Sequence, residues 1–113
     1  MPFNTVTNAY YPEVSLGTVA SNTIAWDVSA AKVATVSISG SCTIANPTNM
    51  VNGGFYSLEV VCTGTASLAW GSVYKFPSGS APSVTGTVNS SDIFTFRCDG
   101  TRIYIVGQSS DVR

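Results

Sequence analysis

Apolar and polar residues alternate most cleanly in the segment Phe55–Thr63. From Tyr56 on, every second residue of the segment is apolar, and these residues share one face: Tyr56, Leu58, Val60 and Cys62. Successive side chains of a β-strand point to opposite faces, so a period of two predicts a strand with one buried face. The segment therefore predicts the longest strand of the chain.

A second alternating segment, Asp92–Cys98, leads into a turn. Its apolar face carries Phe94, Phe96 and Cys98. Asp99-Gly100 follows, and Asp and Gly tolerate the positive φ that a two-residue hairpin turn requires. The next residues, Arg102–Val106, are rich in the β-branched and aromatic side chains that suit a strand. We expect a tight hairpin here.

Weaker patterns predict the remaining strands. The candidates are Val14–Val19, Thr23–Val28, Lys32–Ser39, Ser41–Ala45, Ala66–Trp70 and Thr85–Val88. Turn signals of Gly, Pro and Asn separate these candidates. We expect Gly71–Gly86 to be a long irregular connection and Gln108–Arg113 to be a polar tail. No segment has a helical apolar period of useful length. We expect an all-β fold, either an antiparallel β-sandwich or a jelly-roll-like barrel of roughly seven to nine short strands.

A chain of 113 residues fits one domain. We expect residues 14–113 to form a single β-sandwich domain and residues 1–13 to form an extended N-terminal arm. The arm places Phe3, Tyr10 and Tyr11 among Asn, Thr and Pro without a clean period. It is either a frayed terminus or a segment whose aromatic rings dock on a neighbouring molecule, and the second interpretation is favoured because rings left in water are costly.

Charge content is unusually low, at 10% of residues against about 25% in ordinary globular domains. Ser, Thr and Asn fill the polar positions instead. Two interpretations stay open: a surface built to lie against other protein, or the ordinary use of Ser and Thr on solvent-facing strands. Little charge guards the strand edges, so we expect oligomerisation to cover them.

Composition also excludes several partners and compartments. The net charge of −1 argues against nucleic acid and anionic membranes. No apolar run approaches the ~20 residues of a membrane span, and Met1–Thr5 lacks the start of a signal peptide. Cys42, Cys62 and Cys98 are too few for a disulfide framework, so we expect buried thiols in a protein that folds in a reducing compartment such as the cytoplasm.

Catalytic chemistry has few carriers in this sequence. The chain has no histidine, which removes the usual general base, zinc ligand and nucleophile partner. The acids are scattered singly, and although Glu59 and Asp92 could meet across strands as a glycosidase pair, a solvated strand residue and a turn residue are favoured. We find no calcium loop, zinc spacing or phosphate-binding loop. The sequence predicts a protein that is not an enzyme and has no catalytic residue, metal site or cofactor.

Aromatic residues outside the arm offer a second kind of candidate site. A platform for stacking on sugar rings could use Trp26, Trp70, Tyr74, Phe76 and Tyr104. Trp70 is in phase with Leu68, which favours the core for its ring. Tyr74 and Phe76 lie in the Gly/Pro-rich connection and are expected to be surface contacts. The candidate protein-interface residues are therefore Phe3, Tyr10, Tyr11, Tyr74 and Phe76.

From Ile44 onward, short motifs follow one another in a recognisable order. They are Ile44–Pro47, Gly54–Leu58, Leu68–Trp70, Lys75–Gly79, Ala81-Pro82, Asp92–Phe96 and Asp99-Gly100. In order and spacing this set resembles a small β-domain of tailed-bacteriophage virion proteins, which typically ends tail-fibre or other structural chains. The resemblance covers a little over half of the chain.

The resemblance implies a virion structural protein. A tail fibre would carry the domain at the end of a long shaft, and no shaft precedes it here, so the chain looks more like a capsid decoration (cement) protein. Such proteins are commonly homotrimers on the capsid surface that bridge copies of the major capsid protein and are made in the host cytoplasm. The alternative is a fibre-type receptor-binding module that recognises a host cell-surface glycan, and a third interpretation is a tail-tube or baseplate accessory protein.

Overall fold

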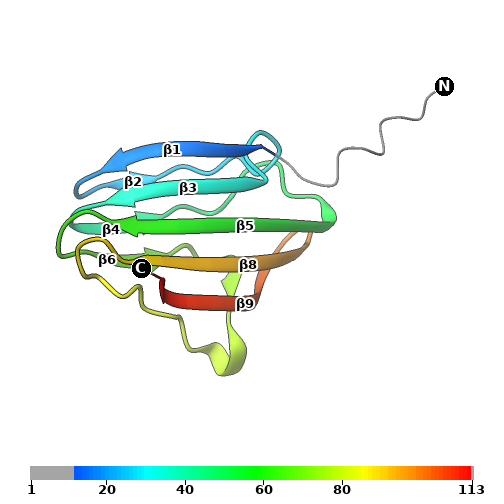
Figure 1. The fold of residues 1–113 in the computed structure, drawn as a ribbon. Helices are drawn as coiled ribbons and strands as arrows, with labels where there is room; N and C mark the ends of the chain where they lie inside the picture. Colours follow the sequence, from blue (N-terminus) through cyan, green and yellow to red (C-terminus); the bar gives the residue numbers. More distant parts are fainter. Residues whose placement is uncertain (1–11, 113) are drawn as a thin grey trace.

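The computed structural model of the protein describes residues 12–112 (Figure 1). These residues form strands joined by turns, with one short 3₁₀ turn at Pro77–Gly79. The strands are β1 (Glu13–Val19), β2 (Thr23–Ile24), β3 (Val33–Ile38), β4 (Ser41–Ile44), β5 (Asn52–Cys62), β6 (Ser67–Trp70), β7 (Tyr74–Lys75), β8 (Ser91–Asp99) and β9 (Ile103–Val112). The predicted all-β class is confirmed.

The strands form two sheets that enclose one core. The larger sheet, sheet A, has the order β1-β3-β5-β8-β9-β7, and the smaller, sheet B, has the order β2-β4-β6. From β1 to β6 the chain alternates between the two sheets, so each pair of strands lies on the pair before it. In Figure 1 these pairs form a stack, and the hairpin of β8 and β9 continues sheet A beside β5.

The pairing within this stack differs from the predicted antiparallel arrangement. β1–β3, β3–β5, β2–β4 and β4–β6 are all parallel, whereas β5–β8 and β8–β9 are antiparallel. The reason is that the turn after each strand leads to the opposite sheet. When the chain comes back to the first sheet, it runs in the same direction as the previous strand of that sheet. Alternation along a strand reports which face is buried but not the direction of the neighbouring strand.

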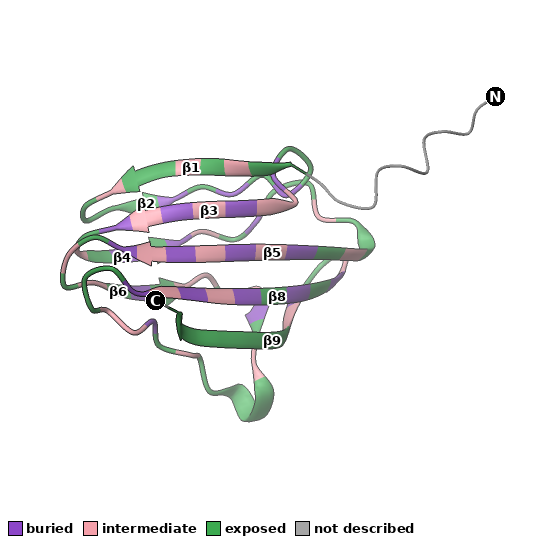
Figure 2. Cartoon of the chain, viewed as in Figure 1, coloured by how far each residue is buried: buried purple, intermediate pink, exposed green. Residues whose placement is uncertain are grey.

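The core lies between the sheets and follows the predicted alternation. Tyr56, Leu58, Val60 and Cys62 of β5 are buried, and so are Phe94, Phe96 and Cys98 of β8 (Figure 2). The three cysteines are buried and free, as expected. Trp26, which is 1% exposed, donates an indole N–H to the Ala31 carbonyl at 2.7 Å. This bond satisfies the one polar group of the ring inside the core.

Several element bounds differ from the prediction. The hairpin turn has Gly100-Thr101 at its centre, one residue later than expected, because Asp99 and Arg102 form the closing pair. Gly100 has a φ of +93°, the left-handed value that favours glycine at the first central position. Gln108–Val112 belongs to β9 and is not a tail, while Thr85–Val88 forms no strand.

Candidate interaction surface

Tyr74 does not lie on the surface, which corrects the expectation that it is a contact residue. It is 3% exposed, and its hydroxyl donates to the Ala45 carbonyl at 3.0 Å. Its ring packs edge-on against Trp70, with centroids 5.2 Å apart, and against Phe96 at 5.8 Å. Burial raises the pKa of the Tyr74 hydroxyl well above its ordinary value. The irregular connection therefore returns to the core at this residue.

The other predicted interface residues have different positions. Phe76 is half-buried and packs against Trp70, with ring centroids 5.6 Å apart. Phe3, Tyr10 and Tyr11 lie outside the described residues. The sugar platform of five aromatic residues that was considered from the sequence is not assembled on the surface, because Trp26 and Tyr74 are buried in the core.

The carboxylate pair considered from the sequence is separated by sheet A. Asp92 pairs with Val60, so its side chain faces the core, whereas Glu59 is on the opposite face. Asp92 is 1% exposed and belongs to β8, so it is not the turn residue that was favoured. Its carboxylate accepts hydrogen bonds from the Thr85 amide, from the Thr85 hydroxyl at 2.7 Å and from the Asp111 amide at 2.7 Å. Asp92 therefore joins β8 to the connection before it and to the end of β9.

The outer face of sheet A is the broadest regular surface of the described chain. Cα partners in adjacent strands share a face, and the register gives four rows across the sheet. The rows are Phe55–Arg97–Tyr104, Glu13–Val33–Ser57–Thr95–Gly107, Ser15–Thr35–Glu59–Ile93–Ser109 and Thr18–Ser37–Val61–Ser91–Val112. Glu13, Glu59 and Arg97 are the charged residues of these rows. The face is therefore dominated by Ser, Thr and β-branched side chains.

One end of this face carries an aromatic and charged row. Phe55 is 61% exposed, Arg97 lies between it and Tyr104, and the Arg102 guanidinium lies 5.9 Å from the centre of the Tyr104 ring. The Tyr104 hydroxyl donates to Asp99 at 3.0 Å, which raises the pKa of Tyr104. The amides of Arg102 and Thr101 donate to the Asp99 carboxylate and lower its pKa to about 2.

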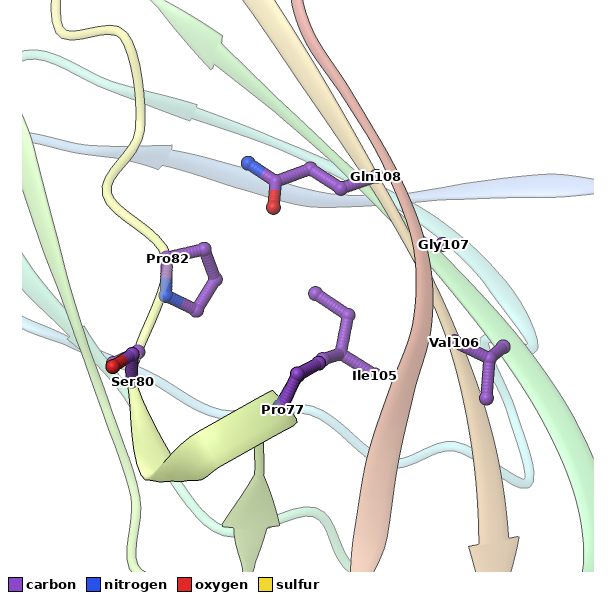
Figure 3. Close-up of a pocket in the computed structure, with 8 residues that line it drawn as sticks. Pro77, Ser80, Pro82, Ile105, Val106, Gly107 and Gln108 are labelled. Carbon is purple, nitrogen blue, oxygen red and sulfur yellow. The ribbon is translucent and has the colours of Figure 1, made fainter.

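A groove lies beside β9, on the side away from β8 (Figure 3). Its volume is about 490 Å³. It is lined by Pro77, Ser80, Ala81, Pro82, Ile105, Val106, Gly107 and Gln108. In Figure 3, Ile105 and Gln108 point from β9 toward Pro82 on the opposite wall. Most of the lining residues are apolar, because they are prolines or have aliphatic side chains.

No pattern of apolar and polar residues in the sequence indicates this groove. The only available signal was the pair of prolines, Pro77 and Pro82, in a connection expected to be irregular. The prolines indicate where regular structure ends, but they do not indicate which strand has an uncovered edge. The register of β7 on β9, which the sequence does not reveal, decides where the groove forms.

Among the described residues, His, Cys, Asp and Glu side chains do not gather into a group of three that could hold a metal ion. Within residues 12–112, no helix is long and apolar enough to cross a membrane. Comparisons of the chain with models of protein families, with curated proteins and with solved structures give no match.

Proposed function

We propose that the protein is a non-enzymatic virion structural protein, and specifically a capsid decoration protein that binds the outer surface of the head. It bridges neighbouring copies of the major capsid protein and so stabilises the capsid against internal pressure. The order of motifs from Ile44 to Gly100 supports the class of protein. A homotrimer made in the host cytoplasm is part of the same proposal, because that is the form the resemblance implies.

The observation that carries the proposal is the outer face of sheet A, where Ser, Thr and β-branched side chains predominate across five strands. Five strands spaced about 4.8 Å apart and seven residues at about 3.4 Å give a face of roughly 600 Å². Interfaces of standard size cover about 800 Å² on each partner, so this face has the right scale for stable docking. Burial of its Val, Ile and Thr side chains would supply binding at about 25 cal/mol per Å² of apolar area. Glu13, Glu59 and Arg97 on the same face would need partners of opposite charge on the capsid.

The test places a charge on this face and a matched charge on the other sheet. Thr95 is exposed on β8 in the outer face of sheet A, and Thr43 is exposed on β4 of sheet B. We expect Thr95→Lys to lower occupancy on purified capsids about tenfold or more, because the ammonium group would be desolvated in the contact. Thr43→Lys should bind as the unchanged chain does.

Electron microscopy of the purified virion gives the second readout. A decoration protein is present in many copies over the head, with sheet A toward the capsid shell. A position on the tail tube or baseplate would overturn the proposal, and so would equal capsid binding by Thr95→Lys and Thr43→Lys.

The second candidate function is recognition of a host cell-surface glycan by a fibre-type module. The row Phe55–Arg97–Tyr104 favours it, because exposed rings beside a hydrogen-bonding guanidinium suit a sugar face and its hydroxyls. A glycan array probed with the full chain and with Phe55→Ala separates the two candidates. Binding that disappears in Phe55→Ala supports glycan recognition, and an array without signal supports decoration.

A further inference from the structure

The groove beside β9 exists because β7 ends early. β7 pairs in parallel with β9 at two positions only, Tyr74 with Ile103 and Lys75 with Tyr104. Pro77 follows, and proline has no N–H to donate to a neighbouring strand. The chain then turns away through Pro77–Gly79. Among the described residues, no strand pairs with Ile105–Val112 on the side of β9 that faces away from β8.

The walls of the groove are held in place. The Trp70 indole N–H donates to the Pro82 carbonyl at 3.1 Å, which fixes the wall opposite β9 to the aromatic cluster of the core. Ile105, half-buried, forms part of the floor, and Val106 beside it is 56% exposed. The groove volume of about 490 Å³ lies within the ~300–1,000 Å³ of sites that bury a ligand. The structure thus combines an open strand edge with an apolar groove that runs along it.

We propose that residues 1–11 of a second copy of this chain bind here as an added strand. An extended segment beside an open edge gains backbone hydrogen bonds, and its alternate side chains enter neighbouring pockets. The segment suits this role, because Phe3–Tyr11 contains Phe, Val, Thr and Tyr, residues favoured in strands, and no Asp, Glu, Lys or Arg. Pro2 lies at its outer end, so no proline interrupts Phe3–Tyr11.

Reach favours the arm of a neighbour over the arm of the same molecule. The segment joins the described chain at β1, and β1 and the vacant position beyond β9 are separated by five strand spacings. Five spacings of about 4.8 Å make about 24 Å, which takes about seven extended residues to cross. A molecule's own arm would keep about four residues for pairing, whereas a neighbour's arm can present all 11.

This contact is heterologous, since the arm of one copy meets the groove of the next. Such contacts close into rings when the rotation between copies is right. The inference deepens the homotrimer of the proposed function by naming the contact between copies. Its test is separate from the test of capsid binding, because self-association holds or fails without any capsid present.

Sedimentation equilibrium of the full chain and its variants tests the proposal. Ala81 is an exposed residue of the groove wall, and Ala69 is exposed on β6, so Ala81→Trp blocks the groove and Ala69→Trp is its matched control. Val6→Pro removes an N–H from the arm, and Val6→Thr keeps a β-branched residue there. We expect Ala81→Trp and Val6→Pro each to raise the dissociation constant about tenfold or more, with both controls near the unchanged chain.

A mixing experiment completes the test. The Ala81→Trp chain keeps its arm and the Val6→Pro chain keeps its groove, so an equimolar mixture should form a one-to-one dimer although neither variant associates alone. Circular dichroism spectra establish that both variants remain folded. The proposal is overturned if the full chain stays monomeric, or if Val6→Pro still associates through β9 edges or sheet faces. It is also overturned if Ala81→Trp and Ala69→Trp have equal effects, or if the mixture stays monomeric.

Discussion

β5 and β9 are long strands of the same sheet, and they differ in how they are covered. β5 has 11 residues, and from Tyr56 to Cys62 every second one is buried. β9 has 10 residues, of which Ile103 is buried and Val106–Val112 are all exposed. Figure 2 shows the alternation of buried and exposed residues along β5 and its absence along most of β9.

The difference follows from the unequal width of the two sheets. Sheet B has three strands and sheet A has six. β2, β4 and β6 lie behind β1, β3 and β5, and the core behind β8 is filled by Trp70 and Tyr74. Beyond Ile103, β9 extends past this cover, and its inner face there meets the connection around Pro82 across the groove. A strand is buried by the layer behind it and not by its own length or β-propensity.

The largest expected effect contrasts a core residue of β5 with its counterpart on β9. Leu58 is fully buried, so Leu58→Ala should lower the free energy of unfolding by about 2–5 kcal/mol through lost burial and a residual cavity. Ile105 is half-buried at the groove, and Ile105→Ala should cost less than about 1.5 kcal/mol. Urea denaturation measures both. Equal losses would mean that β9 is covered as well as β5 is.

Much of this contrast could not be predicted from the sequence. Alternation identified the buried faces of β5 and β8 correctly, because the hydrophobic period is local. It also placed Cys42, Cys62 and Cys98 in the core. It did not identify the parallel stack, because strand direction depends on where each link leads.

The candidate site was harder to predict than the fold. Tyr74 was expected on the surface because Gly and Pro surround it, yet two residues of strand pairing with β9 bring its ring into the core. Asp92 was expected to be a turn residue, yet it lies in β8, and three donors of Thr85 and Asp111 satisfy its buried carboxylate. Both errors concern contacts between residues far apart in the sequence, which no local pattern reports.

A smaller effect is expected at Asp92, which joins the well-covered strand β8 to the exposed end of β9. Asp92→Asn replaces one acceptor oxygen by an amide N–H₂, which opposes a donor of Thr85 or Asp111. Because the site is buried, the free energy of unfolding should fall by about 1.5–3 kcal/mol. Hydrogen exchange should speed up at the Asp111 amide more than at the amides of β5. Unchanged exchange at Asp111 would show that Asp92 does not hold the end of β9.

The smallest effect is expected at the opposite end of β9, in the hairpin turn. The folded pKa of Asp99, about 2, lies below its ordinary value of 3.8 because the Arg102 and Thr101 amides donate to the carboxylate. A lowered folded pKa stabilises the protein above pH ~4, and this stability is lost as the pH falls toward 2. The melting temperature should therefore fall between pH 4 and pH 2, and it should fall less in Asp99→Asn.

Asp27 in the stacked half provides the control, because hydrogen bonds from Ser29 and Asn49 lower its pKa. Asp27→Asn should remove a different part of the fall in melting temperature. Identical falls in the unchanged chain and in Asp99→Asn would show that the hydrogen bonds to the Asp99 carboxylate do not stabilise the turn before β9.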